Sequence, residues 1–214
     1  KMTGHLLVGQ WKIEKSKVKS LSPGLLEEKV NGYIHLIFYL DDGSMMGFSD
    51  LRKFAKVLLG TEEEIKILGN LNKLGPEPLA KDFDLKKFKS LISNEKRKIK
   101  QVLLDQEVIV GMGNIYADEI LWATKIHPQR VASELKDQEL AKMYSNMRAI
   151  FVEAIKFRGT STSDFRHPSG QPGSYAKMLK VYQREGEGCY RCRALIQRIK
   201  IGSRSAHFCP QCQI

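Results

Sequence analysis

The sequence predicts an α+β protein in three parts: a β-strand region, a helical region and a C-terminal zinc-ribbon β-hairpin. Strand-like apolar runs alternate with turn residues as far as Leu59. Helical spacing of apolar residues follows from Thr61 onward. The only four cysteines of the chain form two Cys-x-x-Cys pairs near its end. We place the three parts at residues 1–74, 75–180 and 181–214.

The first part reads as β structure. Strands are expected over residues 6–11, 33–40 and 45–48, because apolar and β-branched residues cluster there. Asp41-Asp42-Gly43 is typical of a hairpin turn between the last two of these strands. Residues 10–31 are polar and rich in Lys, Ser and Gly, so we expect a long surface connection.

The second part reads as helices. Thr61-Glu-Glu-Glu64 is a capping-box pattern, and the two prolines of Leu74-Gly-Pro-Glu-Pro-Leu79 predict a linker, because proline cannot continue a helix. Residues 84–105 contain a few apolar residues between many lysines. Residues 140–154 follow helical spacing closely, and we interpret their methionines and aromatics as core packing rather than a cofactor site.

Gly111-Met-Gly-Asn-Ile-Tyr116 opens one of these helices. Asn114 suits an N-cap, and the flanking glycines permit close approach of the backbone. Exposed amides at a helix N-terminus bind phosphate, although an ordinary helix start fits the same letters. Residues 158–175 form a long Gly/Ser/Thr/Pro loop, which is either functional or disordered.

The cysteines predict a structural Zn²⁺ site. Each Cys-x-x-Cys pair lets one tight turn supply two thiolates to a tetrahedral ion; the four ligands would be Cys189, Cys192, Cys209 and Cys212. In a secreted protein they could form two disulfides, but paired spacing inside a basic chain favours zinc. Residues 195–208 read as two short strands around a Gly/Ser turn, with Arg204 at the hairpin tip.

Composition narrows the partner class. The 214-residue chain is 42% hydrophobic, which argues against disorder. It carries 35 Lys and Arg against 24 Asp and Glu, a formal charge of +11. This excess makes nucleic acid the first candidate partner, with a generally solvated basic surface as the alternative. No apolar run is long enough for a membrane-spanning helix.

Six motifs together resemble the bacterial formamidopyrimidine-DNA glycosylase and endonuclease VIII family. They are Met2-Thr-Gly-His-Leu6, Asp50-Leu-Arg-Lys-Phe54, Leu74-Gly-Pro-Glu-Pro-Leu79, Gly111-Met-Gly-Asn-Ile-Tyr116, Lys125-Ile-His-Pro128 and His207-Phe-Cys-Pro-Gln-Cys-Gln213. The resemblance implies a β-sandwich N-terminal domain, here partial, a helix-two-turns-helix domain and a zinc ribbon, with damaged double-stranded DNA held between domains. It also implies base-excision repair: release of oxidised purines such as 8-oxoguanine and formamidopyrimidines, then strand cleavage by β,δ-elimination.

The resemblance assigns DNA contacts to particular residues. Met2, Arg52 and Phe54 match the residues that fill the space left by an everted base, and their presence favours the formamidopyrimidine branch. A thioether, a guanidinium and an aromatic ring suit that task, because they replace lost base stacking. Without the family, Phe54 reads as a core residue.

Three further residues match the family's grip on the phosphates that flank the lesion: Lys100, Asn114 and Arg204. Arg204 also matches the arginine that the family uses catalytically in δ-elimination. Residues 161–175 stand where the family has a loop that caps the lesion.

The family's catalytic proline and glutamate stand at its N-terminus, and this sequence opens with Lys1 instead. We therefore expect a fragment without glycosylase or lyase activity of its own. The alternatives are a catalytically silent module that binds lesions or abasic DNA, and a zinc-ribbon protein of another nucleic-acid machine. A monomer in the bacterial cytoplasm is what the resemblance implies.

Overall fold

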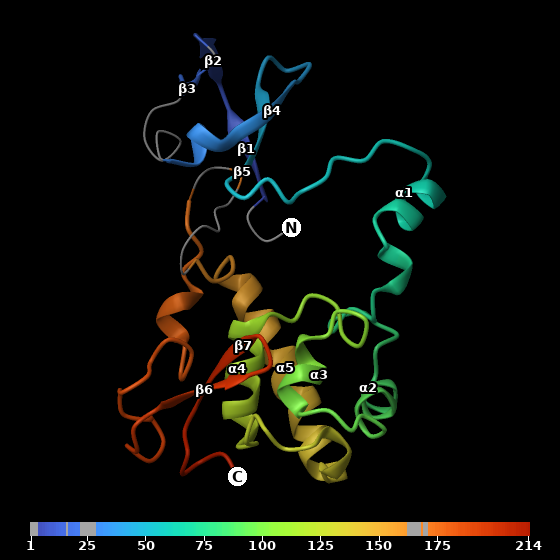
Figure 1. The fold of residues 1–214 in the computed structure, drawn as a ribbon, viewed down its shortest axis with the longest axis vertical. Coiled ribbons are helices and arrows are strands. Elements are labelled where there is room, and N and C mark those ends of the chain that lie inside the picture. Colours follow the sequence, from blue (N-terminus) through green and yellow to red (C-terminus); the bar gives the residue numbers. More distant parts are fainter. Residues whose placement is uncertain (1–3, 16, 22–28, 162–167, 169–170) are drawn as a thin grey trace. The chain divides into compact units, whose positions relative to one another are not determined.

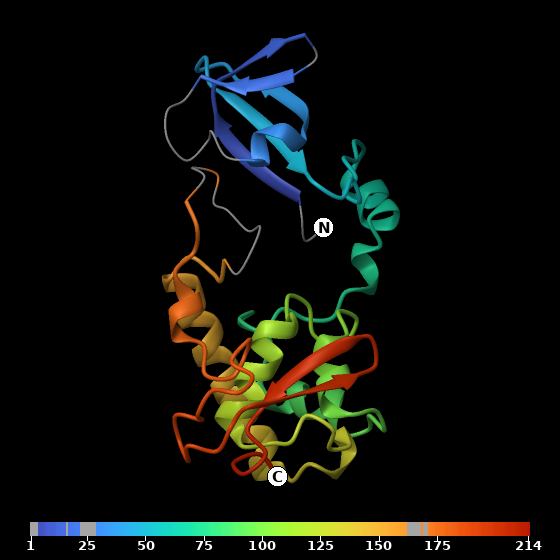
Figure 2. The ribbon, with the colours of Figure 1, turned by 60° about the vertical axis from the view of Figure 1, so that its left-hand side comes forward.

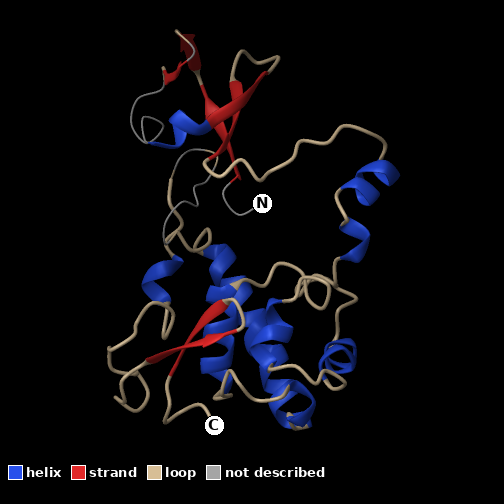
Figure 3. Ribbon diagram, in the orientation of Figure 1, coloured by secondary structure: helices blue, strands red, loops and turns tan. Residues whose placement is uncertain are grey.

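The structure is a computed structural model that describes residues 4–15, 17–21, 29–161, 168 and 171–214. The chain divides into two compact units (Figure 1). The first comprises residues 1–59 and 154–177, and the second comprises residues 60–153 and 178–214. Strands dominate the described part of the first unit, whereas the second is mostly helical and ends in a hairpin (Figure 3). This arrangement confirms the predicted α+β class.

The first unit is built on a three-stranded antiparallel sheet in the order β1-β5-β4. Its strands are β1 (Gly4–Gly9), β4 (Ile34–Tyr39) and β5 (Met45–Asp50). The predicted hairpin turn joins β4 to β5, where the Asp42 carboxylate accepts the Ser44 N–H at 2.8 Å. Three of the predicted strand segments are therefore confirmed.

The long connection expected over residues 10–31 was wrong for its first half, which folds into a second hairpin. Strands β2 (Trp11–Glu14) and β3 (Lys17–Ser20) pair antiparallel there, and η2 (Lys29–Tyr33) is a 3-10 helix. The lysine-rich strands bury little beyond Trp11, whose indole N–H donates to Asn31 Oδ1 at 3.0 Å. The amino-acid composition of β2 and β3 therefore resembles that of a surface loop, although these residues form strands. Residues 16 and 22–28 lie outside the described residues.

The two faces of the β1-β5-β4 sheet differ. On one face Leu7 and Ile34 are buried together with Trp11, in a small core. The opposite face exposes apolar side chains to between 37% and 49% of their area, namely Leu6, Val8, Leu36 and Phe38. A sheet normally buries such a face against another layer.

The second unit begins with α1 (Glu62–Leu68), where both hydrogen bonds of the predicted capping box are formed. After η3 (Leu71–Lys73), the predicted linker passes close to another segment: a Cβ on Gly75 would lie 2.5 Å from the Val108 backbone. Only glycine fits that approach without displacing the backbone, so the linker is tied to the loop ahead of Gly111.

Four helices enclose the main core: α2 (Leu85–Ile92), α3 (Ile99–Leu104), α4 (Asn114–Thr124) and α5 (Asp137–Lys156). The lysine-rich stretch 84–105 thus forms two helices, and η4 (Ala132–Glu134) lies ahead of α5. The stripe on α5 packs into this core as predicted, with Met143 and Met147 fully buried. Within the described part of the chain, none of the helices combines the length and apolarity needed to cross a bilayer.

The second unit ends in the ribbon. Beyond η5 (Tyr175–Met178), the antiparallel strands β6 (Gln197–Ile201) and β7 (Arg204–Phe208) flank the Gly202-Ser203 turn. This confirms the predicted hairpin and leaves Arg204 beside its tip. Strand β7 packs on α4, as both ribbon views show (Figures 1 and 2).

The two faces of the first sheet predict opposite responses to truncation. Leu7→Ala should lower the free energy of unfolding by about 2 kcal/mol or more, because Leu7 is fully buried and truncation leaves a cavity. Leu6→Ala, its neighbour on the exposed face, should cost well under about 1 kcal/mol. Urea denaturation followed by tryptophan fluorescence measures both. Equal losses would mean that the exposed face is covered in solution.

Candidate zinc centre and nucleic-acid interface

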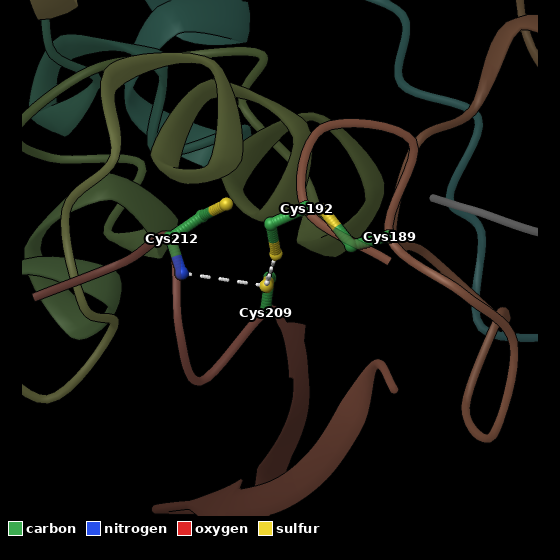
Figure 4. Close-up of side chains that lie close together, drawn as sticks. All are labelled: Cys189, Cys192, Cys209 and Cys212. Carbon is green, nitrogen blue, oxygen red and sulfur yellow. Dashed lines mark hydrogen bonds between the residues drawn. The ribbon is translucent and has the colours of Figure 1, made fainter. Parts of the chain in front are cut away.

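The four cysteines converge on one point from two separate turns (Figure 4). Their Sγ atoms all lie within 4.8 Å of one another, and Cys189 and Cys209 are buried. Val181 and Ile196 are the other fully enclosed residues of this cluster. Four convergent thiols with no disulfide among them fit a tetrahedral Zn²⁺ site, which these residues would hold as thiolates.

Protonation in this cluster is uneven. Burial alone would raise the pKa of Cys189, but hydrogen bonds from the Trp122 indole and from backbone amides lower it to about 6. Burial, together with hydrogen bonds to Cys192 and Cys209, raises the pKa of Cys212 to about 12. Four thiolates this close together repel one another, so all four sulfurs ionise only when a cation lies between them. The four cysteines therefore fit a bound metal ion.

Trp122 connects the zinc centre to α4 and was missed in the sequence. Its indole Nε1–H donates to Cys189 Sγ at 3.4 Å. The Arg191 guanidinium stacks 4.0 Å above its ring and donates to the Trp122 carbonyl at 3.1 Å. Outer hydrogen bonds of this kind orient a ligand and tune its affinity for the metal. The residues around Trp122 do not predict this contact, because Cys189 lies 67 residues further along the chain.

Arg204 begins strand β7 and its side chain is exposed. At the tip beside it, Gly202 adopts a φ of +60°, a backbone conformation that favours glycine. A polar pocket of about 480 Å³ opens here; its lining residues are Glu185, Arg198, Ile199, Lys200, Ser203, Arg204 and Ser205. The pocket carries three cationic side chains, Arg198, Lys200 and Arg204, and it faces solvent. A site that binds a DNA phosphate needs both properties.

The α4 N-terminus differs in one detail from the prediction. Asn114 is the first helical residue rather than the N-cap, which is Gly113, and no side chain caps this end. Asn114 Oδ1 is buried and has no hydrogen-bond partner among the described residues. Gly111, at a φ of +83°, and Gly113 are both exposed, with open space where a Cβ would stand. The backbone amides here are accessible to an anion.

Lys100 does not reach the surface. Its side chain is fully buried, and its ammonium lies 2.5 Å from Asp118 Oδ1. Burial lowers the pKa of Lys100, and the Asp118 carboxylate opposes that shift. In this geometry the residue cannot contact a phosphate, so a direct DNA contact by Lys100 is wrong. Its partner Asp118 lies on another helix, α4, so the burial of Lys100 is not visible in the sequence around it.

Arg52 and Phe54 lie on the turn after β5. The Asp50 carboxylate shapes this turn by accepting the N–H of Arg52 at 3.2 Å and that of Ala55 at 2.8 Å. Phe54 is 63% exposed, and the Arg52 guanidinium lies 5.6 Å from its ring centroid. The core reading of Phe54 is therefore wrong, because the ring is presented to solvent with a cation stacked upon it.

The remaining predicted residues are only partly described. Met2 lies outside the described residues, as do residues 162–167 and 169–170 of the loop expected to cap the lesion. The two ends of that loop meet: Ser161 Oγ accepts the Gly173 N–H at 2.8 Å, and Thr160 pairs with Ser174.

Two buried acids on α4 escaped the sequence reading. Asp118 contacts Lys100 and strand β7, and Glu119 accepts three backbone N–H groups from residues 180–182. Burial raises the pKa of Glu119, and these amides oppose the shift. Adjacent acids inside the apolar run Ala117–Leu121 are unusual, and that pattern could have marked both as buried and partnered.

The Trp122 contact predicts a measurable effect on zinc. Trp122→Phe keeps an aromatic side chain but removes the indole N–H donor, so we expect zinc affinity to fall by roughly tenfold. Competition with a chromogenic chelator measures it. Trp11→Phe is the matched control, because Trp11 is the other tryptophan of the chain and lies in the first unit. Equal affinities for both variants would rule out a role for the indole N–H.

Two family models match the chain. One describes the H2TH domain of formamidopyrimidine-DNA glycosylase and matches residues 74–166. The other describes a zinc finger found in FPG and IleRS and matches residues 186–214. The second match includes all four clustered cysteines, which therefore form the structural zinc site of this chain.

Curated relatives cover most of the chain. Formamidopyrimidine-DNA glycosylase of Pediococcus pentosaceus is 41% identical over 188 residues, which span 87% of this chain and 68% of the relative. The protein of the same name from Heliobacterium modesticaldum is 40% identical over 193 residues, spanning 90% and 70%.

Solved structures agree with these relatives. A complex between Lactococcus lactis Fpg and DNA containing an abasic site has a TM-score of 0.81 and 33% identity, covering 99% of this chain and 72% of that one. MutM in complex with DNA containing carbocyclic 8-oxo-G has a TM-score of 0.80 and 34% identity, covering 100% and 72%. The chain belongs to the formamidopyrimidine-DNA glycosylase family.

Proposed function

We propose that this protein acts in base-excision repair as a DNA glycosylase and abasic-site lyase that removes oxidised purines and cleaves the strand by β,δ-elimination. One observation carries the proposal. The second unit presents two separate groups able to bind phosphate, the uncapped N-terminus of α4 and the exposed Arg204, on a domain pair that matches the family's H2TH domain and zinc finger. Damaged double-stranded DNA is the proposed partner, because the solved complexes hold DNA that contains an abasic site or carbocyclic 8-oxo-G.

Each candidate residue then has a task. Asn114 and the amides beside it bind a phosphate next to the lesion, and Arg204 binds another and assists δ-elimination. Arg52 and Phe54, with Met2, fill the gap left by the everted base. The stacked, exposed pair of guanidinium and ring supports this task, because both groups offer flat faces to the bases.

The parts of the chain divide these tasks. We assign residues 1–74 to a partial β-sandwich domain that carries the gap-filling residues, residues 75–180 to the helix-two-turns-helix domain, and residues 181–214 to the zinc ribbon. We further propose a monomer that works in the bacterial cytoplasm, since the relatives named above come from bacteria.

The gap-filling role predicts a selective defect. The chain should bind a duplex with an abasic-site analogue at least tenfold more tightly than the undamaged duplex. Phe54→Ala should shrink that preference, because each lost stacking contact is worth about 1–3 kcal/mol. Tyr39→Ala is the matched control, since Tyr39 is also an exposed aromatic of the first unit. Fluorescence anisotropy measures both. A preference that survives Phe54→Ala, or that Tyr39→Ala also removes, would contradict the assignment.

Borohydride trapping separates the enzyme from a silent lesion-binding module. Reduction freezes a Schiff base between an enzyme amine and the sugar as a covalent protein–DNA band. The whole gene product should give that band with an 8-oxoguanine:cytosine duplex. Lesion-selective binding without a trapped band would favour the binding module instead.

A further inference from the structure

We propose that Asp118, paired with Lys100, is a positioning residue that sets Arg204 relative to the N-terminus of α4. The inference rests on the proposed function only in taking Arg204 and the α4 N-terminus as phosphate ligands. Neither Asp118 nor Lys100 would touch DNA, since the side chains of both are fully buried.

Asp118 holds strand β7 by its backbone. Its Oδ2 accepts the His207 N–H at 2.9 Å and lies 3.2 Å from His207 Nδ1. Its Oδ1 accepts from the Lys100 ammonium, which also donates to the Ser205 carbonyl at 2.6 Å. Two backbone groups within three residues of Arg204 are thereby fixed to helices α3 and α4.

The same helix carries the other phosphate ligand. Asn114, Asp118 and Trp122 stand four residues apart on α4, so they lie along one face of the helix. That face presents accessible amides at its first turn, anchors β7 at its second and contacts the zinc centre at its third. The distance from the α4 N-terminus to Arg204 therefore depends on the Asp118 contact.

A buried ion pair is a poor choice if stability alone is needed. Desolvating two charges is costly, and apolar residues of similar volume often stabilise a fold as well or better. Ion pairs do impose direction, however, because each oxygen and each N–H must meet its partner. Here both carboxylate oxygens have donors, and the contacts reach the backbone of the strand that carries the exposed cation.

A double-mutant cycle tests the proposal with the full chain and a duplex that carries a tetrahydrofuran abasic-site analogue. Arg204→Ala should weaken binding about tenfold, as for one charge-assisted hydrogen bond, and reduce the slope of log affinity against log salt by about one. Asp118→Asn keeps the side-chain shape but places an amide N–H against a donor. It should weaken binding in the same way, and the double variant should bind no more weakly than Arg204→Ala alone.

Glu119→Gln is the matched control, because Glu119 is a buried acid on the same helix that holds residues 180–182 rather than β7. Its effect should add to that of Arg204→Ala. Circular dichroism and zinc content verify that each variant is folded. Additive losses for Asp118→Asn and Arg204→Ala, or wild-type binding by folded Asp118→Asn, would overturn the proposal.

Failure of the proposed function gives a different result. If the wild-type chain binds damaged and undamaged duplex equally well, the repair role is contradicted. The double-mutant cycle of Asp118 and Arg204 can then be measured on undamaged duplex, because it depends only on contacts with phosphates. If the wild-type chain binds no duplex at all, amide hydrogen exchange tests whether Asp118 anchors β7. Exchange of the hairpin amides over residues 197–208 should accelerate in Asp118→Asn and not in Glu119→Gln, and unchanged exchange would overturn the anchoring of β7.

Discussion

Closure of the four cysteine sulfurs around a metal is the constraint on which the ribbon depends. Around the sulfurs, Val181 and Ile196 are the fully enclosed residues besides Cys189 and Cys209, whereas the hairpin strands bury Ile201, Ala206 and Phe208. A cluster as small as the one around the sulfurs does not hold the two cysteine turns against chain entropy, so metal binding supplies folding free energy directly. Arg204 has a defined position only because this hairpin exists, and so does the polar pocket that it lines.

Helix α4 is where the parts of the second unit meet. Its interior residues Ala117, Ile120 and Leu121 pack into the main core, which fixes the helix. Its polar residues then reach outward in two directions, to β7 through Asp118 and to residues 180–182 through Glu119, while its N-terminus is the proposed phosphate site. A helix that is apolar on most sides and charged at two buried positions is thus a scaffold whose register sets the geometry of the candidate site.

The sequence predicted the features that depend on neighbouring residues. Cysteine spacing, the Thr61 capping box and the Asp41–Gly43 turn are encoded locally, and all three appear in the structure. The features that it did not predict depend on contacts between distant segments. Lys100 and Asp118 meet across two helices, and the pairing of β2 with β3 has no strong apolar signal. Phe54 could be judged core or surface only once its turn was known.

Zinc removal tests the central claim most directly, namely that the metal-closed ribbon on α4 holds the DNA-binding geometry. The full chain would be titrated with a chelator while anisotropy of an abasic-analogue duplex and far-ultraviolet circular dichroism are followed together. We predict that duplex binding falls in step with zinc content while the helical signal persists, because the core of α2–α5 contains no ribbon residue. Undiminished binding by the zinc-free protein would contradict the account.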